Sequence, residues 1–205
     1  MIAGFKTFAG MEYPQLIFSI PDRLVIAHEL AHQWWFGIVG NDEFEDPWID
    51  ESFAQWSMFL PFERNRFWPP LPWVGCPMFS WPNDQVRVSS SMDYFLEHSE
   101  DYWIPYWQGG CALAHLAKDF GLERFLQVLH DYAADHWLGV ATTADFQAAI
   151  ETAAAADGLE LDPSKFWARW RIERPAGAST DLASDAGSGT GPPRTWSIAR
   201  APSWG

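Results

Sequence analysis

Two histidines and two glutamates are spaced along this chain as the ligands and the base of a metal site would be. His28 and His32 stand four positions apart with Glu29 beside the first of them, and Glu51 follows after eighteen intervening residues. Residues at i and i+4 of a helix share one face, so both imidazoles can reach one cation. Two histidines, one glutamate and an open fourth position are typical of catalytic zinc, with Glu29 as the base for a zinc-activated water. The competing interpretation is two buried histidines and a surface glutamate on ordinary helices.

The residues around these ligands predict the two helices that would hold them. The segment 19–22 offers an N-terminal cap and a proline, which favours a helix over about residues 22–36. Asp46 as a cap and Pro47 in the first turn predict a second helix over about residues 47–60. A short turn joins the two helices, so the glutamate of the second can meet the histidines of the first.

Further stretches carry a resemblance to a known family. Besides the two ligand segments, residues 9–14 read Ala-Gly-Met-Glu-Tyr-Pro and residues 105–110 read Pro-Tyr-Trp-Gln-Gly-Gly. The first is similar to the exopeptidase motif G-x-M-E-N, and the second to the Y-x-K-G segment that supplies a catalytic tyrosine. In this order and spacing, the motifs resemble the gluzincin aminopeptidases of the aminopeptidase N type. The resemblance runs from about residue 8 to about residue 172 and includes a capped helix start at 142–146.

The resemblance implies a chemical role for each matching residue. His28, His32 and Glu51 would bind one Zn²⁺ per chain, which lowers the pKa of a water toward about 7 and polarises the scissile carbonyl. Glu29 would take a proton from that water and pass it to the leaving amine. Tyr106 would donate a hydrogen bond to the oxyanion of the tetrahedral intermediate.

Substrate binding, by the same resemblance, falls to the segment before the histidines. Glu12 would hold the free α-ammonium of a peptide, which favours removal of single N-terminal residues. The backbone at Gly10 and Met11 would run along the substrate and add strand-like contacts. Simpler alternatives stay open. Glu12 could be a water-facing carboxylate on an edge strand. Tyr106 could be an aromatic residue at a helix start that packs on its neighbours, and Tyr94 or Tyr102 could be the residue that matches the catalytic tyrosine.

Several positions depart from the family pattern. Ser52 replaces the usual glycine after the third ligand, a change that we expect to be harmless because serine is small. Met58 stands where relatives often carry an acid that orients a ligating histidine, and loss of such a partner typically lowers affinity or activity about 10- to 100-fold. Asp50 is a candidate replacement. Trp107 and Gln108 replace the usual acidic and basic pair after the tyrosine.

The fold class that follows is mainly α (α+β), a truncated thermolysin-like zinc metallopeptidase catalytic domain with a short edge strand before the zinc helices. We expect residues 1–172 to form that domain and residues 173–205, rich in Gly, Ala, Ser and Pro, to form a disordered tail. Measured against the family that it resembles, we expect this sequence to lack the N-terminal β-sandwich and most of the sheet. The chain is therefore either a fragment or a truncation that something else completes.

The remaining segments have predictable local structure. Residues 12–18 read as a short strand, which Pro14 restricts to a sheet edge. The proline-rich residues 61–90 read as an irregular loop. Helices are expected over 106–119, from 122 onward, over 144–156 with Thr143 as the cap, and over 165–171 after Asp162.

Composition limits the partners of the chain. Twenty-seven acidic against thirteen basic residues give a net charge of −14, which argues against nucleic acid because phosphate binding requires a positive surface. No apolar run predicts a membrane span and no signal peptide is visible, so the compartment stays open. Cys76 and Cys111 could form one disulfide, but two isolated buried thiols are the favoured interpretation. The other histidines lack ligand spacing and are expected at the surface or in packing: His98, His115, His130 and His136.

Three functional hypotheses result. The first is a zinc-dependent aminopeptidase that removes N-terminal residues from peptides. The second is a zinc endopeptidase, because an open, truncated cleft need not require a free amine. The third is a non-catalytic or weakly active remnant that binds metal and peptide, which Met58 and the missing sheet favour. Besides peptides, candidate partners are a missing N-terminal domain or a second copy of the chain, since fourteen Trp and fifteen Phe are many for a truncated core to cover.

Overall fold

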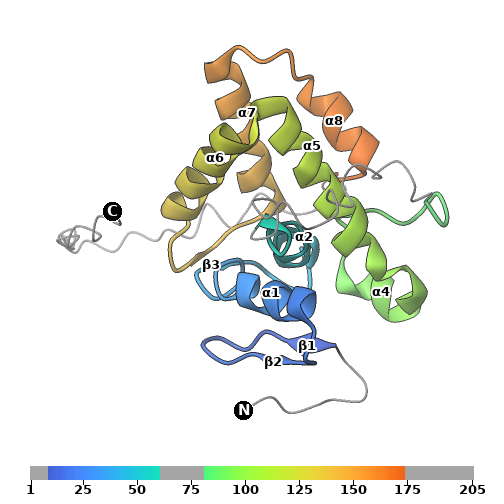
Figure 1. Cartoon of the computed structure of the whole chain (residues 1–205). Helices are drawn as coiled ribbons and strands as arrows, with labels where there is room; N and C mark the ends of the chain where they lie inside the picture. The colour runs from blue at the N-terminus through green and yellow to red at the C-terminus, as the bar shows by residue number, and fades with distance from the viewer. Residues whose placement is uncertain (1–8, 61–80, 174–205) are drawn as a thin grey trace, which may run out of the picture. The chain divides into compact units, whose positions relative to one another are not determined.

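The computed structural model describes residues 9–60 and 81–173 of the 205-residue chain. These residues are mainly helical, with four strands of two residues each (Figure 1). The predicted fold class, a mainly α domain with few strands, is confirmed. None of the helices in the described ranges has the length and apolar character that crossing a membrane requires. The expected tail, apart from its first residue, and residues 61–80 of the expected loop lie outside the described residues.

The two helices predicted to carry the ligands are both present. α1 (Arg23–His32) begins after Asp22, whose side chain accepts hydrogen bonds from the backbone N–H groups of Leu24 at 2.8 Å and Val25 at 3.2 Å. α2 (Trp48–Ser57) follows after a short connection. Both helices end three to four residues earlier than expected. After α1 the backbone tightens into turns, as in the 3.0 Å bond between residues 34 and 31.

A small hairpin contacts one side of α1 (Figure 1). β1 (Gly10–Met11) pairs antiparallel with β2 (Phe18–Ser19). The predicted single strand over residues 12–18 is therefore wrong, because most of that segment connects two shorter strands. The connection turns at Gln15, which has a positive φ of 64°.

A second strand pair joins distant parts of the sequence. β3 (Val39–Gly40), after α1, runs parallel to β4 (Gly139–Val140), so the two segments lie side by side although about 100 residues separate them. The pair therefore joins the segment before α2 to the segment between α6 (Leu122–Asp135) and α7 (Thr143–Asp157).

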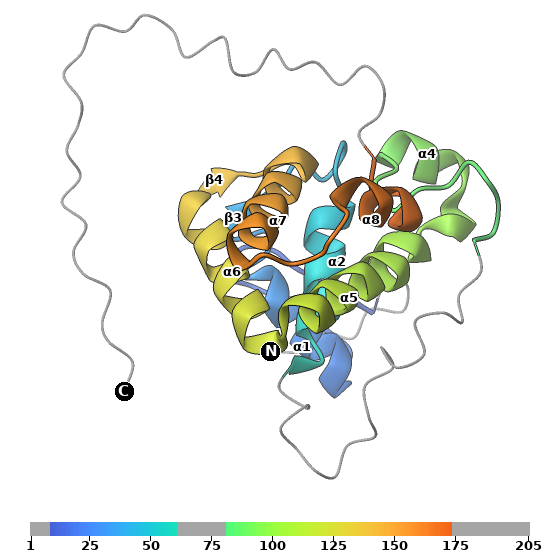
Figure 2. The same cartoon turned by 90° about the horizontal axis from the view of Figure 1, so that it is seen from above.

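α2 lies between α1 and the segment that carries Tyr106 (Figures 1 and 2). The sequence predicts one helix over residues 106–119. The structure has a π-helical segment, η3 (Pro105–Gly109), which continues directly into α5 (Gly110–Phe120). α5 ends at Gly121, whose φ of 80° suits glycine. Single π-turns within helices are frequent at functional sites.

The remaining helices complete the described fold. α4 (Met92–Glu97) and the 3-10 segment η2 (Ser99–Asp101) precede η3. α6 (Leu122–Asp135), α7 (Thr143–Asp157) and α8 (Pro163–Trp170) follow α5 (Figure 2), and α6 packs against both α5 and α7. The expected helices from 122, over 144–156 and over 165–171 are thus confirmed to within one or two residues.

Two of the predicted caps differ from the expectation. Thr142, not Thr143, caps α7, because its hydroxyl accepts from the Asp145 N–H at 3.3 Å while the Asp145 carboxylate accepts from the Thr142 N–H at 2.8 Å. The Thr143 hydroxyl donates instead to Asp46 at 2.5 Å. Asp46 therefore makes no side-chain cap on α2, whose N-cap is Pro47.

Aromatic rings from several helices form the centre of the core. Phe53 of α2 contacts Phe146 of α7 edge-on at 4.9 Å between centroids and Tyr132 of α6 at 6.1 Å. All three side chains are 2% exposed or less.

Cys111, on α5, is disulfide-bonded, so the expectation of isolated thiols is wrong. The other cysteine, Cys76, lies outside the described residues.

Candidate active site

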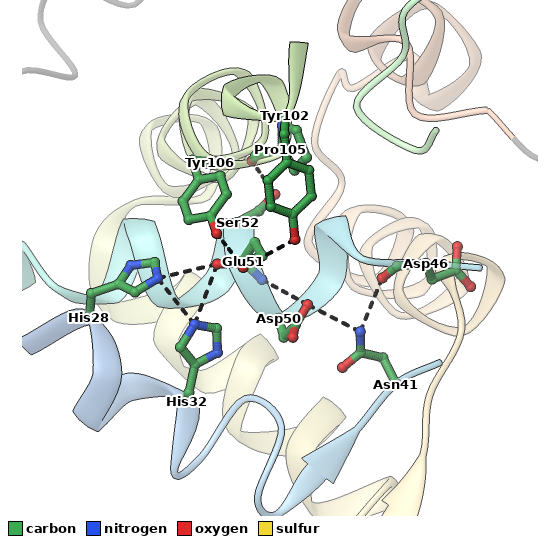
Figure 3. A network of polar contacts seen from close by, with 10 residues as sticks. All are labelled: His28, His32, Asn41, Asp46, Asp50, Glu51, Ser52, Tyr102, Pro105 and Tyr106. Atoms are coloured by element: carbon green, nitrogen blue, oxygen red, sulfur yellow. Dashed lines mark hydrogen bonds and ion pairs between the residues drawn. The ribbon is translucent and has the colours of Figure 1, made fainter. Parts of the chain in front are cut away.

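Three buried side chains from α1 and α2 converge on one point (Figure 3). The Nε2 atoms of His28 and His32 lie 3.1 Å apart, and Glu51 Oε2 lies 3.2 Å from the first and 3.4 Å from the second. The histidines stand one turn apart on α1, and Glu51 stands in the first turn of α2. The structure thus brings together the three residues that the sequence predicts as a ligand set, named here the ligand triangle.

The ligand triangle has the dimensions of one face of a tetrahedral zinc site. With zinc–ligand distances of about 2.0–2.1 Å, tetrahedral geometry separates neighbouring ligand atoms by about 3.4 Å. The observed separations are 3.1–3.4 Å. Two ring nitrogens at this distance repel each other if both present lone pairs, so the arrangement needs a proton or a cation between them. The donor set, two imidazoles and one carboxylate, is one that zinc accepts.

The electrostatics of the triangle show the same need for positive charge. Burial disfavours the charged form of His32, but hydrogen bonding to Glu51 and attraction by its carboxylate outweigh burial and raise the pKa of His32 to about 9. Burial also acts to raise the pKa of Glu51, but the hydrogen bonds from His28 and His32 outweigh it and lower that pKa to about 2. A proton on His32 thus balances the Glu51 carboxylate, and a divalent cation would displace that proton on binding.

Glu29 lies between the ligand triangle and the hairpin. Burial, opposed by His32 and reinforced by the charges of Glu12 and Glu51, raises the pKa of Glu29 to about 7. Its Oε2 atom has no hydrogen-bond partner within the described ranges. The β1 backbone crosses directly over this carboxylate, since a Cβ at Gly10 would fall 2.0 Å from Glu29 Oε1. A side chain at residue 10 would therefore displace the Glu29 carboxylate from this position.

Glu12 follows β1 and faces the same cluster. An oxygen of Glu12, one of Glu29 and a ring nitrogen of His32 lie within 4.8 Å of one another. Glu12 is half-buried, so it is not a fully water-facing carboxylate. Gly10 and Met11 form β1 itself, and their backbone therefore borders the site on this side.

Two tyrosines contact the second oxygen of Glu51 (Figure 3). Tyr106, in η3, donates a hydrogen bond to Glu51 Oε1, and its ring stacks on that of His28 with the centroids 5.6 Å apart. The Tyr102 hydroxyl lies 3.5 Å from the same oxygen. Tyr94 donates instead to an aspartate outside the triangle. The structure therefore places Tyr106 at the site, as the sequence predicts, and removes Tyr94 as an alternative.

Ser52 ties α2 to the turn that carries Tyr106. Its hydroxyl is fully buried and donates to the Pro105 carbonyl at 2.7 Å. Gly109 approaches it closely, since a Cβ at Gly109 would lie 1.9 Å from Ser52 Oγ. The small serine is accommodated, as expected, but it also makes a bond that glycine could not make.

The outer edges of the two imidazoles, opposite the point where the ligand triangle converges, lack hydrogen-bond partners among the described residues. The Nδ1 atoms of His28 and His32 are buried and find no partner in the part of the chain that the structure describes. Met58, which replaces the usual acid, is buried at the C-terminal end of α2. Asp50, the candidate replacement, accepts hydrogen bonds from Asn41 at 3.2 Å and from the adjacent backbone N–H at 3.0 Å. Asp50 therefore orients α2 and not a ligating imidazole.

Comparison with known proteins agrees with this geometry. The profile of the Peptidase family M1 domain matches residues 21–170 of the chain. The chain belongs to this family. The family is one of zinc metallopeptidases, and a group of residues able to hold the ion is present in the ligand triangle.

Relatives with assigned activities are much longer proteins. The chain is 28% identical to the alanine/arginine aminopeptidase of Saccharomyces cerevisiae over 145 residues, which cover 65% of this chain and 16% of that protein. It is 27% identical to aminopeptidase M1 of Arabidopsis thaliana over 62% of this chain and 15% of that protein. Among solved structures, the M1 zinc metallopeptidase of Deinococcus radiodurans superposes with a TM-score of 0.58 at 20% identity, covering 81% of this chain and 37% of that one. This likeness supports the fold.

Two contacts at the site were not predicted from the sequence. Tyr102 stands four positions before Tyr106, and this i, i+4 spacing could have indicated that both hydroxyls share one helical face. The bond between Ser52 and Pro105 had no sequence signal, because it depends on how closely two helices approach.

Proposed function

We propose that this chain binds one zinc ion through His28, His32 and Glu51 and hydrolyses peptides at their N-terminus. The observation that carries the proposal is the ligand triangle, with its sides of 3.1–3.4 Å, next to the buried carboxylate of Glu29. Zinc, when bound, supplies a Lewis acid that acidifies a water and polarises the scissile carbonyl. Membership of the M1 family supports the assignment.

The proposal gives two residues a part in the chemistry. Glu29, one of whose carboxylate oxygens has no hydrogen-bond partner among the residues that the structure describes, takes a proton from the attacking water and delivers it to the leaving nitrogen. Tyr106 turns its hydroxyl from Glu51 to the carbonyl oxygen of the substrate as negative charge develops there. One donor of this kind typically lowers the barrier by about 3–4 kcal/mol.

Recognition of the peptide N-terminus is assigned to the hairpin side. Glu12 lies within 4.8 Å of Glu29 and His32, so its carboxylate can hold an α-ammonium one residue away from the scissile bond. The β1 backbone at Gly10 and Met11 offers hydrogen-bonding groups along the substrate. A mutant of the Deinococcus relative has been solved in complex with a Tyr-Ser-Ala substrate, which supports short peptides as the substrate class.

The test compares free and blocked peptides. We expect zinc-dependent release of fluorophore from aminoacyl substrates, loss of that release with a chelator, and recovery on adding zinc. Glu29→Gln should lower turnover by about 10²- to 10⁴-fold while retaining the metal. Cleavage of N-terminally blocked peptides that survives Glu12→Ala would instead select the endopeptidase hypothesis. Activity that is indifferent to both chelation and Glu29→Gln would remove the proposal.

A second candidate function is metal and peptide binding without turnover. One observation favours it: the Nδ1 atoms of His28 and His32 have no partner in the described residues, and Met58 cannot provide one. Ligating histidines normally donate this hydrogen to an oxygen acceptor, which orients the ring. Full zinc occupancy with no hydrolysis across a peptide library would select this function.

A further protein partner remains a prediction from composition. Trp34 and Trp137 are 40% and 54% exposed and contact each other edge-on at 5.7 Å. An exposed apolar pair of this kind can form part of a contact with another domain or with a second copy of the chain. Sedimentation of the purified chain at several concentrations measures whether it associates with itself.

A further inference from the structure

The two oxygens of Glu51 have separate partners. Oε2 faces the two imidazoles at 3.2 and 3.4 Å. Oε1 faces away from them, toward the hydroxyls of Tyr106 and Tyr102 (Figure 3). This division keeps Oε2 available as a single ligand atom, because hydrogen bonds to Oε1 fix the plane of the carboxylate.

Tyr106 cannot serve Glu51 and a substrate at once. Its hydroxyl has one hydrogen, and in this structure that hydrogen is donated to Glu51 Oε1. If Tyr106 turns to a substrate oxygen, Oε1 loses its donor within a buried site. A buried carboxylate oxygen without a donor is unfavourable, so this turn needs a replacement donor.

Tyr102 is placed to be that replacement. Its hydroxyl lies 3.5 Å from Oε1, too far for a full hydrogen bond while Tyr106 occupies the oxygen. Its ring meets that of Tyr106 edge-on at 5.6 Å, and that of Phe95 edge-on at 5.2 Å.

We propose that Tyr102 is a positioning residue that closes onto Glu51 Oε1 when Tyr106 turns to the substrate. Tyr102 thereby holds Glu51 in place as a ligand through Oε2 and frees Tyr106 for the reaction. The inference rests on the proposed function, because it requires a metal at the ligand triangle and a substrate oxygen near Tyr106.

A double-mutant cycle on zinc affinity provides the first test, measured by competition with a chromophoric chelator. Tyr102→Phe and Tyr106→Phe should each lower the affinity less than about threefold, since one hydroxyl remains for Oε1, whereas the double variant should lower it about 10- to 100-fold. Tyr132→Phe is the matched control. Tyr132 is a buried tyrosine whose hydroxyl has no hydrogen-bond partner among the residues described, so its loss should leave the affinity unchanged.

Turnover by the zinc-loaded chain provides the second test. Tyr102→Phe should lower kcat about 10- to 100-fold, because Tyr106 then leaves Oε1 bare when it turns. KM and the urea midpoint of unfolding should change little. A purely structural role for Tyr102 would lower stability and zinc affinity together, without this specific loss of kcat.

The results separate this inference from the proposed function. If the unaltered chain binds no zinc or has no activity, the proposed function fails first. If it binds zinc and turns over, but the two substitutions combine additively in zinc affinity or Tyr102→Phe leaves kcat unchanged, the role of Tyr102 is overturned alone. A synergistic loss of affinity together with the loss of kcat supports it.

Discussion

Replacing Gly109 by alanine tests whether the stability of the fold depends on the close packing of α2 against η3, the segment that carries Tyr106. An alanine Cβ there would lie 1.9 Å from Ser52 Oγ and 2.8 Å from Ser52 Cβ, against 3.4–4 Å for an ordinary contact. The hydroxyl can rotate away, but it then gives up its 2.7 Å bond to the Pro105 carbonyl, worth about 1 kcal/mol. The Cβ atom of Ser52 cannot rotate, so the backbones must separate, which typically costs about 1–3 kcal/mol. We therefore expect the free energy of unfolding to fall by about 2–4 kcal/mol.

Ser52→Gly is the matched rescue, because it removes both clashing atoms. Alone it should cost about 2 kcal/mol, one for the lost hydrogen bond and one for glycine inside a helix. Once the side chain of Ser52 is removed, the nearest remaining neighbour of a Cβ at Gly109 is Val88 Cγ1 at 3.2 Å. Adding Gly109→Ala in this background should therefore cost less than about 1 kcal/mol.

Urea unfolding followed by tryptophan fluorescence measures the unaltered chain, the two single variants and the double variant. If Gly109→Ala costs the same in both backgrounds to within about 0.5 kcal/mol, the two residues are not coupled and the reasoning is refuted. The two substitutions should also be coupled in their effects on kcat, because Tyr106 lies between Pro105 and Gly109. A displacement of about 1 Å at such a residue can lower the rate about 100-fold.

Three other substitutions test separate parts of the account. Glu29→Gln should lower kcat by about 10²- to 10⁴-fold with zinc content unchanged; a fluorogenic assay with metal analysis checks this, and undiminished activity would contradict it. Thr142→Ala should cost about 1 kcal/mol of unfolding free energy, because it removes the cap on α7 that Asp145 completes; an unchanged urea midpoint would argue against the capping box. Tyr132→Phe should be neutral or stabilising, since its hydroxyl is buried without a partner in the described residues; a loss above about 1 kcal/mol would reveal a missed hydrogen bond.

Helix boundaries were mostly predictable where local chemistry decides them, although the cap of α7 was placed on Thr143 and not on Thr142. Asp22 caps α1 through its own side chain, and Gly158 ends α7 in the left-handed region at φ 64°. Asp162 likewise caps α8. Each of these signals acts within three or four residues, so it can be read from the sequence without knowing the fold. The two histidines of the ligand triangle were predictable for the same reason, because their i, i+4 spacing places both imidazoles on one face of α1.

Features that depend on partners far along the chain were not predictable. Asp46 has the right residue type for a helix cap, but its carboxylate is taken by Thr143, 97 positions later. The segment after Met11 has strand-forming residues, yet only two residues on each side pair, because the turn at Gln15 comes so early. The disulfide at Cys111 depends on a distance that no spacing reveals.

The fine geometry of the site was likewise not predictable from the sequence. The π-helical turn at η3 differs from an α-helix by one residue in its hydrogen-bond register, and residue types do not report that difference. Its effect is large, because it sets where the Tyr106 hydroxyl meets Glu51. The absence of an acid at Met58 was visible in the sequence, whereas the lack of a partner for the Nδ1 atoms of His28 and His32 among the described residues was not.

The central claim is that the ligand triangle binds zinc, and X-ray absorption at the zinc edge on the metal-loaded chain tests it most directly. The account predicts one zinc per chain with two imidazole nitrogens and oxygen ligands at about 2.0–2.1 Å, and loss of the imidazole signal in a variant that lacks His32. A chain that retains no zinc, or a zinc shell without imidazole, would contradict it.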